Sequence, residues 1–86
     1  RIPFGSLVEL GIIKPGTTIF DNKKKISAKI MADGSIKHAQ TEGSIHKVAA
    51  TILGAESCNG WTYWHYNLDG AVVPIDHLRQ RLISNN

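Results

Sequence analysis

The spacing of apolar residues switches between a helical and a strand period several times within one short chain. Helical spacing is clearest from Ile45 onward, where the apolar positions form one stripe and Gly54 ends it. Strand alternation is clearest over residues 26–30, where every second residue is apolar. The order of these segments lacks the regular strand–helix–strand alternation of a doubly wound sheet. We therefore expect an α+β fold, with a small, mainly antiparallel sheet packed by about three helices.

The ends of the expected elements are set by turn and capping residues. Asp33-Gly34 between two strand-like runs is a strong hairpin signal, and Asp69-Gly70 predicts another turn. The expected helices run from Pro3 to Gly11, from Ser44 to Gly54 and onward from Pro74. The expected strands cover residues 17–21, 26–30, 35–37 and 61–66.

A chain of 86 residues has room for one domain with a small core. Its apolar content of 42% and charged content of 20% are those of a globular protein. The single cysteine, Cys58, cannot form an internal disulfide, and no apolar run is long enough to span a bilayer. We therefore expect a soluble intracellular domain without a membrane partner. Because it begins with Arg1 rather than Met, we expect it to be a segment of a longer polypeptide.

Lysines gather in one part of the chain. Residues 14–47 contain seven lysines and three acidic residues, whereas residues 48–86 contain two arginines and three acidic residues. The formal net charge of the whole chain is +3. Because clustered cations act through their summed field, this asymmetry indicates a polyanionic partner such as nucleic acid.

The start of the helix at Ser44 is the first candidate binding site. A helix N-terminus carries free N–H groups and a partial positive charge, so acidic residues are favoured there. This helix instead has His46 and Lys47 in its first turn, which suits a bound anion such as phosphate. The alternative is that Ser44 only caps the helix and that Lys47 is solvated.

The second candidate is an asparagine on a tight turn beside an indole. Four aromatic rings fall within residues 61–66, more than one face of a small core absorbs, so at least one ring is expected at the surface. We expect this ring to be Trp61, which would stack on a nucleotide while Asn59 hydrogen-bonds to it. A purely structural role for both residues is the alternative.

The third candidate is Arg79. Helical spacing from Ile75 places this arginine inside the apolar stripe of the last helix, so its charge needs a partner. That partner would be a bound anion, or alternatively an internal acid such as Asp76, or the stem would lie along the core with its charged head in water.

The sequence contains no recognisable metal or catalytic motif. The four histidines and the cysteine match no zinc-ligand spacing, and a lone cysteine is more often a small buried hydrophobe than a nucleophile. A phosphate-loop glycine motif, a dinucleotide fingerprint and a paired-carboxylate constellation are all absent. We therefore expect no catalytic residue, no metal and no cofactor in this domain.

Seven blocks of the sequence occur in a known family in this order and with nearly this spacing. They are Pro3-Phe4-Gly5 through Leu10, Lys14-Pro15-Gly16, Ala32-Asp33-Gly34-Ser35, Gly43-Ser44-Ile45-His46-Lys47, Cys58-Asn59-Gly60-Trp61-Thr62, Trp64-His65 and Pro74-Ile75-Asp76. Together they resemble the C-terminal domain of the cell-cycle-regulated adenine-N6 DNA methyltransferases. That domain belongs to the group called restriction-enzyme and adenine-methylase associated, or RAMA.

The resemblance implies a DNA-binding appendage of a bacterial, cytoplasmic, nucleoid-associated enzyme that methylates adenine in a GANTC context. The partners it implies are double-stranded DNA and the catalytic domain of the same chain, with a homodimer as a further possibility. S-adenosylmethionine would belong to the parent enzyme, because the cofactor-binding glycine motif and the catalytic Asp-Pro-Pro-Tyr motif are absent here. The family's DNA-binding positions correspond to Ser44, Asn59, Trp61 and Arg79. The lysines expected to attract the duplex are Lys23, Lys24, Lys25, Lys37 and Lys47.

The chain departs from the family pattern at three positions. Phenylalanine is usual where this chain has Tyr63 and Tyr66. A basic residue is usual near Met31, so the resemblance does not carry over a phosphate contact to the hairpin at Met31. Two alternative functions stay open. One is a stand-alone reader of methylated-adenine DNA with an aromatic pocket around Trp61 and Tyr63, and the other is a protein–protein or dimerisation module.

Overall fold

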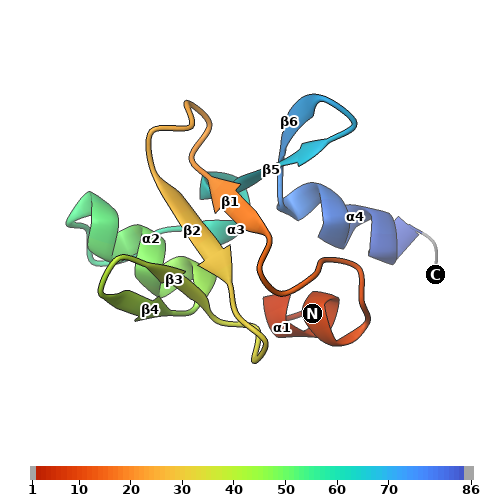
Figure 1. The fold of residues 1–86 in the computed structure, drawn as a ribbon, viewed down its shortest axis with the longest axis horizontal. Helices are drawn as coiled ribbons and strands as arrows, with labels where there is room; N and C mark the ends of the chain where they lie inside the picture. The colour runs from red at the N-terminus through yellow and green to blue at the C-terminus, as the bar shows by residue number, and fades with distance from the viewer. Residues whose placement is uncertain (1, 85–86) are drawn as a thin grey trace.

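Six antiparallel strands form one sheet in the order β4-β3-β2-β1-β5-β6, and four helices accompany it (Figure 1). The computed structural model describes residues 2–84. The helices are α1 (Phe4–Glu9), α2 (Ile45–Leu53), α3 (Gly60–Tyr63) and α4 (Asp76–Ser84). The strands are β1 (Thr18–Phe20), β2 (Ser27–Ile30), β3 (Ile36–His38), β4 (Thr41–Gly43), β5 (His65–Leu68) and β6 (Ala71–Pro74). The expected α+β fold with an antiparallel sheet is confirmed.

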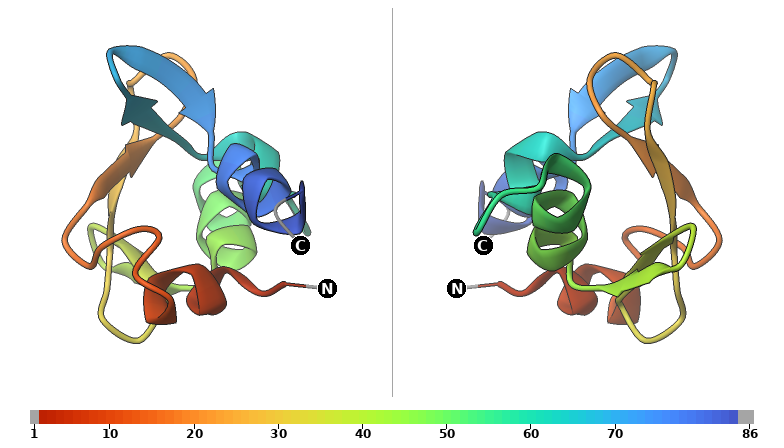
Figure 2. Two further views of the ribbon diagram at one scale, coloured as in Figure 1. Left: turned by 90° about the vertical axis from the view of Figure 1, so that its right-hand side faces the viewer. Right: turned by 90° about the vertical axis from the view of Figure 1, so that its left-hand side faces the viewer.

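The helices lie on one side of the curved sheet (Figure 2). The helices cover this side because it carries the apolar side chains of the sheet. In strand β2, Ala28 and Ile30 are buried while Ser27 and Lys29 are exposed. The buried side chains belong to the same core cluster as Ile45 and Val48 of α2. The other face of β2 therefore points to solvent, and we call the side of the sheet that carries Lys29 the outer face.

Helix α2 begins and ends where its sequence predicts. Ser44 is the N-cap, and its hydroxyl accepts a hydrogen bond from the Lys47 N–H at 3.0 Å. Gly54 ends the helix in the left-handed conformation with φ of 67°, which glycine adopts without steric cost. The hairpin predicted at Asp33-Gly34 joins β2 to β3, and the turn at Asp69-Gly70 joins β5 to β6.

The prediction of a strand over residues 61–66 is wrong for the first half of that range. Gly60–Tyr63 form the short helix α3, and strand β5 starts only at His65. The Asn59 side-chain oxygen accepts from the Trp61 N–H at 3.0 Å, which caps a helical turn and directs the chain away from an extended conformation. A helical turn also changes which rings share a face, because the strand period no longer applies to them.

The last helix also starts later than expected. Pro74 ends the edge strand β6, and α4 begins at Asp76. Proline lacks the N–H that a central strand needs, but an edge strand has one side without a partner and tolerates it. Strands β4 and β6 were not expected from the sequence, and each lies at an edge of the sheet.

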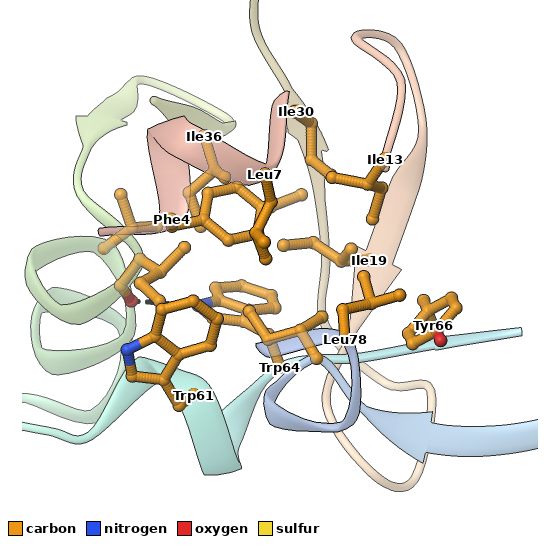
Figure 3. Packing of buried hydrophobic residues seen from close by; sticks show 14 of the residues in the cluster. Phe4, Leu7, Ile13, Ile19, Ile30, Ile36, Trp61, Trp64, Tyr66 and Leu78 are labelled. Carbon is orange, nitrogen blue, oxygen red and sulfur yellow. Dashed lines mark hydrogen bonds between the residues drawn. The ribbon is translucent and has the colours of Figure 1, made fainter. Parts of the chain in front are cut away.

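The core gathers side chains from every helix and from both halves of the sheet (Figure 3). Trp64 is fully buried, and its indole N–H donates to the Ile45 carbonyl oxygen at 3.0 Å. Tyr66 is also buried, and its hydroxyl has no hydrogen-bond partner within residues 2–84. Burial raises the pKa of the Tyr66 phenol. A buried hydroxyl without a partner costs desolvation free energy, so the Tyr66 oxygen does not stabilise the core.

Candidate functional site

The first turn of α2 is joined to α3 by a tight junction. The Gly60 N–H donates to Nδ1 of His46 at 2.9 Å. A Cβ on Gly60 would lie 2.6 Å from the carbonyl carbon and oxygen of Ile45, so only glycine permits this approach. Together with the bond from the Trp64 indole to Ile45, these contacts bring residues 44–46 and 59–61 into one surface, which we call the helix-end face.

The helix-end face is less cationic than the sequence suggested. An imidazole nitrogen that accepts a hydrogen bond carries no proton, so in this arrangement His46 is neutral and its remaining proton is on Nε2. The expectation that two cations occupy the first turn of α2 is therefore met by Lys47 alone, whose side chain is exposed. The first turn contains no acidic residue, as the sequence shows.

Ser44 caps helix α2, which was the alternative to a phosphate-binding role, and its side chain is exposed at the surface. Its hydroxyl accepts from the Lys47 N–H, so the hydroxyl hydrogen is free to donate to another group. The first N–H groups of α2 have no partner inside the helix by virtue of their position. Capping and ligand binding are therefore compatible at this residue.

Asn59 is exposed and holds α3 in place. Its side-chain oxygen is engaged by the Trp61 N–H, and its carbonyl oxygen accepts from Thr62 and Tyr63. The side-chain NH₂ makes no hydrogen bond within residues 2–84. This group is a donor that a base, sugar or phosphate oxygen can use without disturbing the helix cap.

The expectation that Trp61 lies at the surface is wrong. The side chain is only 6% exposed, because α3 turns the ring towards the core. Its ring packs edge-on against Phe4, with centroids 5.9 Å apart and an interplanar angle of 67° (Figure 3). The indole therefore offers a ligand its rim rather than an open stacking face.

Arg79 covers the ring of Trp61 from α4. Its guanidinium carbon lies 4.4 Å from the Trp61 ring centroid, a cation–π arrangement. Its Nη2 lies 2.6 Å from Oδ1 of Asp76, so the internal-acid alternative is the one realised in this structure. About a quarter of each side chain stays exposed.

A cavity of about 480 Å³ opens beside the helix-end face. It is lined by Ile2, Pro3, Phe4, Gly5, Gly34, Ser44, Ile45, His46 and Trp61. We call it the helix-end cavity. Its walls are mainly apolar, with Ser44 and His46 as polar groups, which is the usual composition of a ligand pocket. Ser44 and His46 also line a second hollow of about 390 Å³ that includes Lys47.

The sequence reasoning from single residues missed part of this cavity. Phe4, Gly5 and Gly34 come from α1 and from the β2–β3 hairpin, which approach so closely that a Cβ on Gly34 would lie 2.7 Å from the Gly5 Cα. No periodicity reveals such an approach. The signal was present in the resemblance, however, because four of its seven blocks contribute residues to this cavity.

Four of the predicted DNA-binding lysines lie away from the helix-end cavity. Lys23, Lys24 and Lys25 occupy the β1–β2 connection, and Lys24 Nζ lies 4.9 Å from the ring centroid of Phe20. Lys37 is exposed on β3, and its direct cross-strand partner is Lys29 on β2. None of these lysines lines the helix-end cavity. The structure thus separates these four lysines, three in the β1–β2 connection and one on β3, from the helix-end cavity.

The aromatic pocket around Trp61 and Tyr63 that the reader alternative requires is not formed. Tyr63 packs edge-on against Trp64 and lines a different cavity, together with Asp21 and His65. Burial raises the pKa of the Tyr63 phenol, with the nearby charge of Asp21 adding to the effect. The two rings therefore do not enclose one ligand.

No cluster of three or more His, Cys, Asp or Glu side chains within residues 2–84 is arranged to hold a metal ion. Over the same part of the chain, every helix is too short or too polar to cross a membrane.

The fold and the site together define a small α+β domain with an apolar cavity between a serine-capped helix end and an asparagine-capped turn. The chain belongs to the family described as Restriction Enzyme Adenine Methylase Associated, or RAMA, whose family model matches residues 1–86. It is similar to the Type II methyltransferase M.HinfI of Haemophilus influenzae, with 29% identity over 79 residues. The match covers 92% of this chain and 22% of that protein, so the chain spans about a fifth of the relative.

Proposed function

We propose that this chain is the DNA-binding domain of an S-adenosylmethionine-dependent adenine-N6 DNA methyltransferase of the cell-cycle-regulated, GANTC-directed kind. Membership of a family associated with adenine methylases supports the parent activity. The parent enzyme would supply the cofactor and the catalytic residues and act on DNA in the bacterial cytoplasm. The observation that carries the proposal is that Ser44 and Trp61 line one 480 Å³ cavity, while Asn59 caps the turn that carries Trp61.

The helix-end face would hold the phosphate backbone. Ser44 and the first N–H groups of α2 donate to one phosphate, Lys47 adds charge, and Arg79 pairs with a second phosphate. Lys23, Lys24 and Lys25 in the β1–β2 connection and Lys37 on β3 would contribute long-range attraction. Contacts of this kind fix the register of the protein on DNA without reading its sequence.

The helix-end cavity would receive an unpaired base or its sugar. Adenine must leave the base stack before its amino group is methylated, so an adenine methyltransferase works on opened DNA. A cavity of 480 Å³ lies within the usual size range of ligand pockets, and Phe4 and Trp61 form apolar walls for a base. The NH₂ of Asn59, which makes no hydrogen bond within residues 2–84, would donate to a sugar or phosphate oxygen of the opened strand.

The reader alternative has no supporting observation, because Trp61 and Tyr63 line separate cavities. A dimerisation role is tested by the same samples used below, through the mass of the protein in sedimentation.

The proposal predicts a preference for opened DNA. The 86-residue chain is titrated by fluorescence anisotropy with a paired GANTC duplex and with the same duplex carrying unpaired bases at the adenine. Because one base contact contributes about 1–3 kcal/mol, we expect binding to the opened duplex to be about tenfold tighter. Equal affinity for the two duplexes contradicts the role of the cavity.

Asn59→Asp is the matching variant for this titration. It keeps the oxygen that caps α3 but replaces the NH₂ donor with a negative charge, so we expect the preference for opened DNA to disappear. Asn67→Asp on β5 is the control, because it makes the same chemical change at an exposed position outside the residues 44–46 and 59–61 that form the helix-end face. Equal effects of the two variants would show that only net charge matters.

A further inference from the structure

Arg79 lies between an aromatic ring and a carboxylate that belong to different elements. Its guanidinium sits 4.4 Å above the ring of Trp61 from α3, and its Nη2 lies 2.6 Å from Oδ1 of Asp76, in the first turn of α4. Trp61 fixes the position of the guanidinium, because the ring itself is held by Phe4 and is almost fully buried. The carboxylate is the only one of these groups that competes with a phosphate.

The contact between Arg79 and Asp76 is close but incomplete. Nε of Arg79 is buried and has no hydrogen-bond partner within residues 2–84, and the Oδ1 atom of Asp76 is not aligned for a hydrogen bond. The other carboxylate oxygen receives only a long bond of 3.4 Å from Gln80. A guanidinium has five N–H donors and prefers two parallel bonds to one anion. This pair therefore leaves Arg79 with unused donors.

We infer that Asp76 limits the affinity of this domain for DNA by occupying the guanidinium of Arg79. This inference rests on the proposed function, in which Arg79 pairs with a phosphate. A carboxylate within hydrogen-bonding distance of the guanidinium repels an incoming phosphate and cancels the charge that attracts it. Asp76 is thus a positioning residue that sets the strength of a contact made by Arg79.

Asp76→Asn tests the inference, because asparagine keeps the shape of the side chain and removes its charge. In anisotropy titrations of the 86-residue chain with the opened GANTC duplex, we expect this variant to bind about three- to tenfold tighter than the unmodified chain. We also expect the slope of log K against log salt to become steeper, by no more than about 0.9, the value for one phosphate contact, because Arg79 would then meet its phosphate with its full charge. If Asp76 had a purely structural role, Asp76→Asn would neither tighten DNA binding nor steepen the salt slope.

Asp69→Asn is the charge-matched control. Asp69 lies in the β5–β6 turn with φ of 51°, a conformation that asparagine also adopts readily, so the variant changes net charge by the same amount without strain. We expect it to leave the salt slope unchanged and to alter affinity less than Asp76→Asn. In an Arg79→Gln background, Asp76→Asn is expected to have no larger effect than Asp69→Asn, because its target is gone.

Two results overturn the inference while leaving the proposed function intact. Weaker binding of Asp76→Asn would show that the carboxylate orients Arg79 for DNA, and unchanged affinity and slope would show that the pair does not compete with phosphate. If the unmodified chain shows no salt-dependent binding to either duplex, the proposed function fails and the inference fails with it. Asp76→Glu, which retains the charge, is the second variant should Asp76→Asn not fold, and we expect it to bind no more tightly than the unmodified chain.

Discussion

Replacing Gly60 with alanine is expected to destabilise the domain by about 3 kcal/mol. The new Cβ would lie 2.6 Å from the carbonyl carbon and oxygen of Ile45, and both atoms are backbone that cannot rotate away. Relief of this clash would separate α3 from α2 and break the hydrogen bond from Gly60 to His46. For a domain of this size, the melting temperature should fall by about 15 °C.

Gly5→Ala is the matched control for this substitution. Gly5 lies in α1, where its Cβ would meet nothing closer than the Gly34 Cα at 4.0 Å. Alanine is favoured over glycine in a helix, so stability should stay the same or rise by about 0.5 kcal/mol. Both variants are compared by thermal and denaturant unfolding of the same chain. If the Gly60→Ala and Gly5→Ala variants have the same melting temperature, the tight junction between α2 and α3 is not present.

The second large effect concerns salt. If Ser44, Lys47, Arg79 and the lysines of the β1–β2 connection and of β3 together neutralise about four phosphates, the slope of log K against log salt is about −3.6. The affinity then falls about 100-fold between 50 and 200 mM salt. This is measured by anisotropy at several salt concentrations with the paired duplex. A slope smaller than that of one phosphate contact contradicts the electrostatic part of the proposed function.

The distance of the β1–β2 lysines from the helix-end cavity gives this salt experiment its control, because none of them lines that cavity. Replacing Lys23, Lys24 and Lys25 with glutamine should make the slope shallower, because these lysines lie in the β1–β2 connection. The same variant should keep its preference for opened DNA, because none of the three residues lines the helix-end cavity. Asn59→Asp, in contrast, should remove the preference for opened DNA.

Local signals in the sequence were sufficient for helix α2 and for the hairpin at Asp33-Gly34. In α2 the cap at Ser44, the apolar stripe and the stop at Gly54 all favour the same boundaries. The hairpin required only a turn that tolerates positive φ, which Gly34 adopts at 87°. Where local preferences agree with one another in this way, tertiary contacts have little to correct.

The region from Asn59 to Tyr66 shows the opposite case. Its aromatic residues favour a strand, but Asn59 caps a helical turn and Gly60 packs onto the backbone of Ile45. The second contact joins residues far apart in the sequence, so no local pattern reports it. This is also why Trp61 was expected at the surface and is instead buried.

The site itself was only partly predictable. Helical spacing placed Arg79 in the apolar stripe of α4, and the structure finds it half-buried against Trp61. The sequence left its partner open between an anion and Asp76, because spacing alone does not fix a rotamer. The cavity depends on α1 meeting the β2–β3 hairpin, and that approach is a property of the assembled fold.

An amide-resolved NMR titration of the ¹⁵N-labelled chain with the opened GANTC duplex tests most directly whether the helix-end face binds DNA. We predict that the largest shift changes fall on Ser44 to Lys47, on Asn59 to Trp61 and on Arg79, with smaller changes in the β1–β2 connection. Shift changes confined to the outer sheet face, with residues 44–47 and 59–61 unaffected, would contradict the proposed interface.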